Sequence, residues 1–194
     1  MNSGWNPIAQ YIDQTLLKPF AGEKTVRDFC EEALPYDFAS VCIHPQYVPV
    51  VKAILDDSKT AVCTVVGFPL GANQTAVKMK ETELAVVQGA GEIDMVLPIG
   101  SLKEGETRTV FEDVSGVAKI CKDSGNLLKV ILETALLTND EIRTACKICI
   151  DSGADFVKTS TGFASHGATV DAVRLMAETC QGTGSPAGEE RRVS

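Results

Sequence analysis

Three charged side chains lie inside short apolar runs of the sequence, where a buried strand would normally carry apolar residues. Asp94 interrupts the run EIDMV, Lys129 interrupts LLKVILE and Lys158 interrupts DFVKTST. Burying any of these charges without a partner is costly. Because side chains alternate between the two faces of a strand, each charge faces one side only. If the runs are neighbouring parallel strands, the three charges can meet in one interior.

A lysine amine in such an interior can attack a carbonyl carbon. Burial and a second nearby cation both disfavour the ammonium form, so Lys129 and Lys158 together predict a lowered lysine pKa. Lowering that pKa from about 10.4 to about 7 requires roughly 4.6 kcal/mol. Once an imine forms, its positive charge is an electron sink, and Asp94 can move the protons that carbon–carbon cleavage requires. The pattern predicts aldol chemistry without a metal or a cofactor. For each charge taken alone, an ion pair that only fixes packing is the alternative interpretation.

The elements that would position these charges alternate between strand-like and helical patterns. The strand-like runs cover residues 39–43, 61–67, 92–98, 127–133 and 155–161, and an earlier run at 11–16 is a candidate first strand. Helical stretches such as 72–88 separate them, with Gly89, Gly125 and Gly153 between helix and strand. This order predicts an α/β fold of six strand–helix units, either a closed β/α barrel or an open doubly wound sheet.

Composition excludes several classes of protein. The chain has 194 residues, a formal net charge of −8 and 44% hydrophobic residues, as expected of a globular chain with a sizeable core. An acidic surface argues against nucleic acid and anionic membranes as partners. The first residues, MNSGWNPIAQ, lack the pattern of a secretion signal, and the seven cysteines are an odd number. We therefore expect a cytoplasmic protein with reduced thiols.

Six segments in order resemble the deoxyribose-phosphate aldolases, the class I enzymes of the deoC/DERA type. They are DQTLLKP at 13–19, SVCIHP at 40–45, VGFPLG at 66–71, GEIDMV at 91–96, LKVILET at 128–134 and KTSTGF at 158–163. The resemblance implies a β/α (TIM-type) barrel over residues 1–180. It also implies reversible Schiff-base cleavage of 2-deoxy-D-ribose 5-phosphate, with that phosphosugar, glyceraldehyde 3-phosphate and acetaldehyde as the small-molecule partners.

The resemblance also implies roles for individual residues. The Schiff-base lysine of the family corresponds to Lys158 and its proton-relaying aspartate to Asp94. Residues that match positions lining the family's substrate pocket are Asp13, Thr15, Cys42 and Lys129, and Gly162 matches part of its phosphate-binding rim. No metal site is implied.

The chain departs from the family pattern in two places. Gln14 stands where the family usually has histidine, a polar change with a small expected effect. After about residue 176 the family continues into a K-[AS]-[AS]-G-G strand with a second lysine and then a G-[AT]-S phosphate loop, and neither segment occurs here. Residues 181–194, QGTGSPAGEERRVS, are instead expected to form a disordered tail outside the family pattern.

The missing segments predict a barrel with about six of its eight units, as in a truncated product. Open edges on the first and sixth strands would favour self-association, so a homo-oligomer is expected. Three functions stay open at this point: a working aldolase, a catalytically impaired isoform or interaction partner, and a phosphosugar-binding module without chemistry.

Two further patterns are interpreted as structural. Cys146 and Cys149 form a C-x-x-C inside a helical stretch and are expected to be small buried hydrophobic residues. In the helix expected over 75–88, Val77, Leu84 and Val87 are expected to face the core, and Lys78 is expected on the solvated face.

Overall fold

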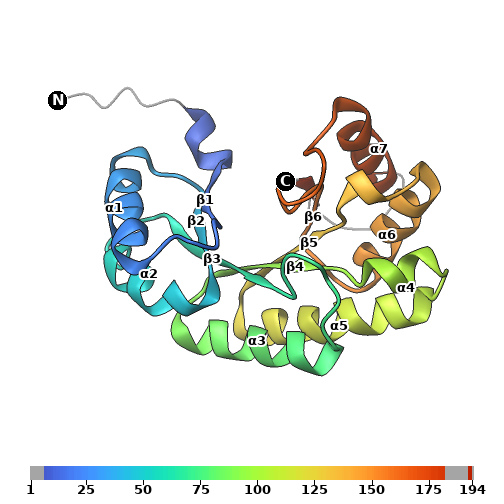
Figure 1. The fold of residues 1–194 in the computed structure, drawn as a ribbon, viewed down its shortest axis with the longest axis horizontal. Coiled ribbons are helices and arrows are strands. Elements are labelled where there is room, and N and C mark those ends of the chain that lie inside the picture. The colour runs from blue at the N-terminus through green and yellow to red at the C-terminus, as the bar shows by residue number, and fades with distance from the viewer. Residues whose placement is uncertain (1–6, 182–191, 194) are drawn as a thin grey trace.

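The computed structural model describes residues 7–181 and 192–193 of the chain. Its parallel sheet has the strand order β1-β2-β3-β4-β5-β6-β7. The strands are β1 (Asp13–Leu16), β2 (Ser40–Ile43), β3 (Ala61–Val66), β4 (Glu92–Val96), β5 (Leu127–Ile131), β6 (Phe156–Lys158) and β7 (Arg192–Val193). The six expected strands are confirmed, and the sheet curls as part of a β/α barrel (Figure 1).

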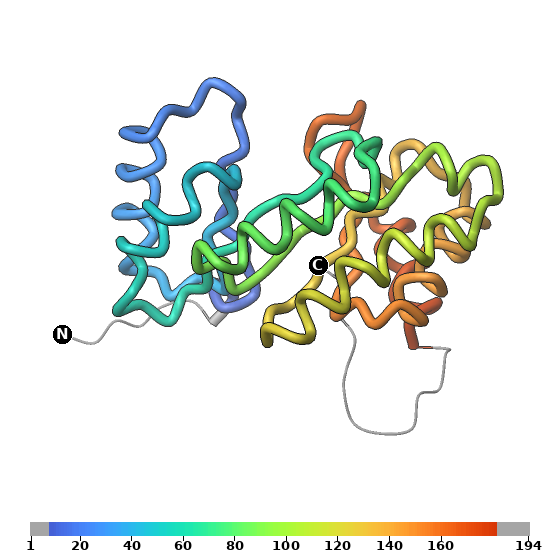
Figure 2. Tube along the Cα trace, turned by 90° about the horizontal axis from the view of Figure 1, so that it is seen from below, coloured from blue at the N-terminus to red at the C-terminus, as the bar shows by residue number. Residues whose placement is uncertain are grey.

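The helices surround the outside of the curled sheet (Figure 1). They are α1 (Glu23–Ala33), α2 (Val48–Ile54), α3 (Thr75–Gln88), α4 (Ile99–Lys103), α5 (Thr107–Ser124), α6 (Asn139–Asp151) and α7 (Val170–Gln181). Short 3-10 helices cover Pro7–Tyr11, Leu34–Tyr36, Pro45–Tyr47 and Thr134–Leu136. Figure 2 shows α3 and α5 running next to each other across the convex side, where they pack together.

The strands have two buried faces with different chemistry. Toward the helices, Val41, Ile93, Leu128 and Val157 belong to one large apolar cluster. Toward the inside of the curl, the same strands carry polar side chains and a small cluster of Cys42, Cys63 and Val65. Burial on both faces explains why the strands appear in the sequence as nearly continuous apolar runs. Because the outer face is apolar, the charges of Asp94, Lys129 and Lys158 lie on the inner face.

Local sequence signals set the helix ends and the loop paths. The side chain of Thr138 accepts a hydrogen bond from Glu141 N, and the Glu141 side chain accepts one from Thr138 N, which together cap α6. Gly89 ends α3 at a positive φ of 103°. In the loop after β3, a Cβ on Gly71 would lie 2.0 Å from the carbonyl oxygen of Leu97. Only glycine therefore allows this loop to pass so close to the end of β4.

The orientation predicted for α3 is wrong. Val77, Leu84 and Val87 are exposed, whereas Lys78 is completely buried. The Lys78 ammonium donates to Asp113 Oδ2 on α5 at 2.6 Å and to the carbonyl oxygen of Val96 at 3.0 Å. These partners satisfy the charge in the interior, which hydrophobic periodicity within one helix cannot reveal.

Only part of the expected C-terminal tail lies within the described residues. Gln181 is the last residue of α7, and Arg192 and Val193 form β7. β7 pairs with Phe156 and Val157 of β6, so the expectation of an unpaired edge on the sixth strand is wrong at these two residues. The expected edge at β1 is found: among the described residues its strand partner is β2 alone.

The expectation for the C-x-x-C pair is confirmed. Cys146 and Cys149 are both buried within α6. No helix in the described part of the chain is long and apolar enough to cross a membrane.

Candidate active site

The two lysines and the aspartate that interrupt the strands meet on the inner face of the curled sheet. Asp94 on β4 and Lys129 on β5 are paired in the strand register. Lys158, the last residue of β6, donates a hydrogen bond from Nζ to Asp94 Oδ2 at 2.6 Å. Carboxyl ends of parallel strands collect at one end of a barrel, where active sites of this architecture lie. The geometry confirms the interior meeting point that alternation along the strands predicts.

Lys129 is the more enclosed of the two lysines, with 4% of its side chain exposed against 20% for Lys158. Its Nζ lies 2.6 Å from Glu92 Oε2, 2.7 Å from Asp13 Oδ2 and 3.3 Å from Asp94 Oδ1. Asp13 belongs to β1, at the far edge of the sheet, and its Oδ1 also accepts from Ser40 Oγ at 2.7 Å. Lys129 therefore holds three carboxylates, one from β1 and two from β4, in one network.

The carboxylates set the direction of the lysine pKa values. Burial lowers the pKa of Lys158, but the charge of Asp94 and a hydrogen bond to it outweigh burial, and the pKa is raised above its ordinary value. At Lys129 burial likewise acts downward, and Cys63, Asp94, Glu92 and Asp13 raise the pKa far above its ordinary value. The predicted lowering is therefore wrong for the ligand-free site, because the carboxylates around each ammonium outweigh its like-charged neighbour.

The acidic groups respond to the same network. Burial acts to raise the pKa of Asp13, but Lys129, Ser40 and Lys158 overcome it and the pKa is lowered. At Glu92 burial dominates, and the nearby carboxylates of Asp13 and Asp94 add to it, so the pKa is raised despite Lys129.

The remaining sequence-predicted residues, Cys42, Thr15 and Gly162, differ in how deeply they are buried. Cys42 is buried on β2 next to Cys63 on β3, its partner in the strand register. Thr15 on β1 is exposed, and its hydroxyl donates to the carbonyl oxygen of Asp13 at 2.8 Å. Gly162 is exposed on the loop after β6 at a positive φ of 85°, with open space where a Cβ would stand. The structure thus places Cys42 in the cluster and Gly162 on its rim.

Sequence reasoning missed three contributors to the site. Glu92 stands two residues before Asp94, so strand alternation alone could have placed both on the inner face. Cys63 Sγ donates to Asp94 Oδ1 at 3.3 Å, and burial chiefly raises its thiol pKa. Glu133, buried at a positive φ of 57°, accepts hydrogen bonds from the backbone N and the hydroxyl of Thr161. This contact ties the loop after β5 to the loop that follows Lys158.

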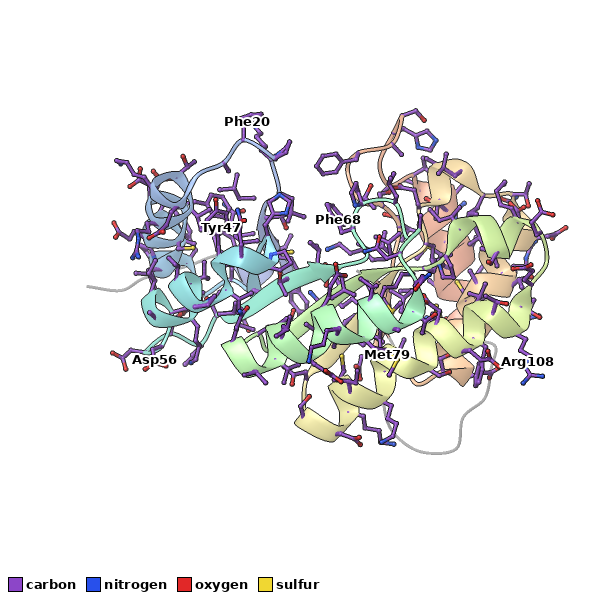
Figure 3. The ribbon with its side chains drawn as sticks, turned by 60° about the horizontal axis from the view of Figure 1, so that its bottom comes forward. Phe20, Tyr47, Asp56, Phe68, Met79 and Arg108 are labelled. Atoms are coloured by element: carbon purple, nitrogen blue, oxygen red, sulfur yellow. The ribbon has the colours of Figure 1, made fainter. Side chains whose placement is uncertain are left out.

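Aromatic side chains surround the open end of the cluster. Phe68 on the loop after β3 and Phe163 on the loop after β6 meet edge to face, with their ring centroids 5.4 Å apart. Phe20 follows β1 and is 82% exposed; Figure 3 shows Phe20 and Phe68 on loops along the same side of the molecule. The rim offers apolar surface next to a charged interior, a combination suited to a small organic ligand.

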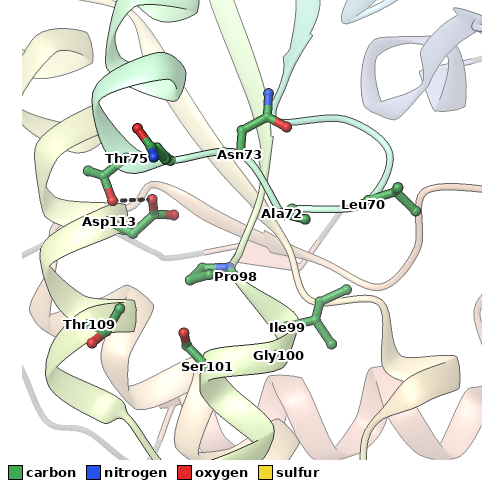
Figure 4. Close-up of a pocket in the computed structure, with 12 residues that line it drawn as sticks. Leu70, Ala72, Asn73, Thr75, Pro98, Ile99, Gly100, Ser101, Thr109 and Asp113 are labelled. Atoms are coloured by element: carbon green, nitrogen blue, oxygen red, sulfur yellow. Dashed lines mark hydrogen bonds between the residues drawn. The ribbon is translucent and has the colours of Figure 1, made fainter.

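A separate cavity of about 310 Å³ lies between the loop after β3 and the starts of α4 and α5 (Figure 4). Thr75 and Asp113, two of its lining residues, satisfy each other through a 2.7 Å hydrogen bond. None of the sequence-predicted site residues lines it. We therefore place the candidate active site at the charge cluster and not in this cavity.

Comparisons with known proteins agree with the residue pattern. A family model described as DeoC/LacD family aldolase matches residues 8–193. Proteins named deoxyribose-phosphate aldolase from Carboxydothermus hydrogenoformans and Clostridium botulinum are each 49% identical to this chain. Both matches cover 89% of this chain, and they cover 76% and 80% of the relatives' lengths, respectively.

Solved structures of proteins described as deoxyribose-phosphate aldolases also resemble this chain. A putative deoxyribose-phosphate aldolase from Coccidioides immitis superposes with a TM-score of 0.90 and 40% identity, covering 96% of this chain and 71% of that one. The deoxyribose phosphate aldolase from Aeropyrum pernix, described as a unique tetrameric structure, superposes with a TM-score of 0.83 and 32% identity. That match covers 90% of this chain and 73% of that one.

Proposed function

The chain belongs to the DeoC/LacD family of aldolases, and on this premise we propose that it catalyses reversible cleavage of 2-deoxy-D-ribose 5-phosphate to D-glyceraldehyde 3-phosphate and acetaldehyde. The observation that carries the proposal is the 2.6 Å contact between Lys158 Nζ and Asp94 Oδ2. Lys158 is the nucleophile, and Asp94 is the group that moves protons. Lys158 is the last residue of β6, and Asp94 lies in the middle of β4 on the same inner face.

The first step is the loss of a proton from Lys158. Its raised pKa means that the ammonium predominates at neutral pH. Asp94 Oδ2 is close enough to accept that proton directly. The free amine then attacks the aldehyde carbon C1 of the open-chain sugar, and loss of water gives a protonated imine.

Carbon–carbon cleavage follows from the charge of the imine. A base removes the proton of the C3 hydroxyl, the C2–C3 bond breaks, and its electron pair moves to form an enamine on Lys158. The C3–C5 fragment leaves as glyceraldehyde 3-phosphate. Protonation of the enamine at C2 and hydrolysis of the imine release acetaldehyde and restore the amine. Asp94, directly or through water, is the proton carrier for these steps.

The other residues of the cluster position this pair. Lys129 contacts Asp94 Oδ1 at 3.3 Å and holds this carboxylate in position, while Asp13 and Glu92 fix Lys129 in place. On this proposal Cys42 and Thr15 contact the substrate, and Gly162, which has open space where a Cβ would stand, leaves room for the phosphate group. The partly open β1 edge supports assembly with further copies of the chain.

Reductive trapping tests the proposal. The protein is incubated with acetaldehyde and borohydride, and the modified lysine is located by peptide mass mapping. We expect an ethyl group on Lys158 and none in a Lys158→Gln variant. A Lys147→Gln variant is the matched control, because Lys147 is exposed on α6 outside the cluster. Equal labelling of all exposed lysines, with no preference for Lys158, would overturn the assignment; labelling without sugar-phosphate turnover would identify an impaired form.

A further inference from the structure

A set of potential metal-ligand atoms lies next to the proposed catalytic pair. Cys42, Cys63 and Asp94 lie on the consecutive strands β2, β3 and β4, and all three are buried. One donor atom from each residue lies within 4.8 Å of the other two. Two sulfur atoms and one carboxylate oxygen are a donor set that zinc and cadmium favour. We propose that these three residues bind one thiophilic divalent cation, Zn²⁺ or Cd²⁺, which inhibits the enzyme.

The spacing of the donors suits a tetrahedral cation. With Zn–S bonds of about 2.3 Å and Zn–O bonds of about 2.0 Å, neighbouring ligand atoms stand about 3.5–3.8 Å apart. Cys63 Sγ already lies 3.3 Å from Asp94 Oδ1. Cys42 and Cys63 are partners in the parallel register and face the same interior. Small side-chain rotations therefore bring all three donors to a common centre, leaving one position for water.

The charge balance also permits binding beside two ammonium groups. The cation replaces one proton on each thiol, and those two protons pass to the solvent. Exchange of two protons for one divalent cation leaves the net charge of the interior unchanged. Lys129, 3.7 Å from Cys63 Sγ, keeps its contacts with Asp13 and Glu92. Hard cations such as Mg²⁺ bind thiolates poorly because they prefer oxygen ligands, so they are not expected at this site.

The consequence for catalysis rests on the proposed function. A cation on Asp94 occupies the carboxylate that would otherwise accept the proton of Lys158. Imine formation then slows, and the cation acts as a reversible inhibitor. This role differs from that of a cofactor, since the proposed aldol chemistry needs no metal.

A cadmium titration followed by ultraviolet absorbance tests the binding site without relying on enzyme activity. Thiolate–cadmium charge transfer gives an absorption band whose growth reports occupancy. We expect saturation at one cation per chain in the native protein. A Cys63→Ala variant should lose most of the band and bind at least about tenfold more weakly. Cys149→Ala is the matched control, because Cys149 is an equally buried thiol on α6, and its titration should match that of the native protein.

Lys158 trapping in the same titration separates the two proposals. Loss of trapping at the concentration that saturates the band supports inhibition through Asp94. No band, or a band that survives in the Cys63 variant, overturns the metal site whatever the trapping shows. A saturating band with unchanged trapping overturns inhibition only. Absence of trapping before any cadmium is added counts against the aldolase function and leaves the absorbance result to decide on the site.

Discussion

Removing the cation at Lys129 is expected to destabilise the fold strongly at neutral pH. In a Lys129→Met variant the side chain keeps a similar length, but Asp13, Glu92 and Asp94 face one another with Lys158 as the only ammonium that the described residues leave beside them. Breaking a buried ion pair by removing one partner costs about 3–5 kcal/mol. Because Lys129 contacts three carboxylates at 3.3 Å or less, we expect the loss at pH 7 to lie within this range.

The pH dependence of that loss identifies its cause. Lys129 helps lower the folded-state pKa of Asp13 below the ordinary value of 3.8. A carboxylate with a lowered folded pKa stabilises the fold above its unfolded pKa, and this contribution disappears as the pH falls through the folded value. The variant lacks this contribution, and its carboxylates can become neutral by binding protons. The difference between the two proteins should therefore shrink as the pH falls below 3.8 and through the lowered folded pKa of Asp13.

Urea unfolding followed by circular dichroism measures the effect at each pH. Lys103→Met is the control, because Lys103 pairs with Glu141 at the surface, where 45% of its side chain is exposed. We expect it to cost less than about 1 kcal/mol. Adding Glu92→Gln to the Lys129 variant should restore part of the lost stability. A loss below about 1 kcal/mol for Lys129→Met, or one independent of pH, would refute the reasoning.

Three smaller predictions follow from single features. Because Asp94 can accept the Lys158 proton within the ion pair, the rate of imine trapping should change by less than about tenfold between about pH 6 and pH 9, and a tenfold rise per pH unit would contradict direct transfer. Gly71→Ala should destabilise the fold by at least about 1 kcal/mol more than Gly105→Ala in urea unfolding. Both positions have positive φ, but only Gly71 also approaches the Leu97 carbonyl. Thr138→Ala should cost about 1 kcal/mol through loss of the α6 cap, measured in the same way, and an unchanged midpoint would argue against that cap.

The meeting of Asp94, Lys129 and Lys158 could be predicted from strand alternation. Which face of a strand a side chain occupies depends only on its position within that strand, so the sequence alone places all three on one face. It could not predict the direction of the Lys158 pKa. That direction depends on how many carboxylates surround the lysines, and Asp13 comes from a strand 116 residues before Lys129.

The orientation of α3 shows the same limit. Lys78 is buried because Asp113, 35 residues later, supplies its counter-charge. No periodicity within residues 75–88 contains that information, so the apolar residues of α3 were assigned to the wrong side. The resemblance of the six family segments supplied the proposed roles of Thr15 and Gly162, which neither position would suggest by residue type alone.

The contact between Asp13 and Lys129 joins strands that are not neighbours. β1 and β5 are separated by three strands in the sheet, yet these side chains meet at 2.7 Å across the interior. This ion pair therefore connects β1 to β5 across the interior and helps to keep the sheet curved. Because β1, like β7, is paired on one side only among the described strands, local fraying is expected at this edge. Each opening of β1 would withdraw Asp13 from Lys129 and remove one of the three carboxylates that hold this lysine in place.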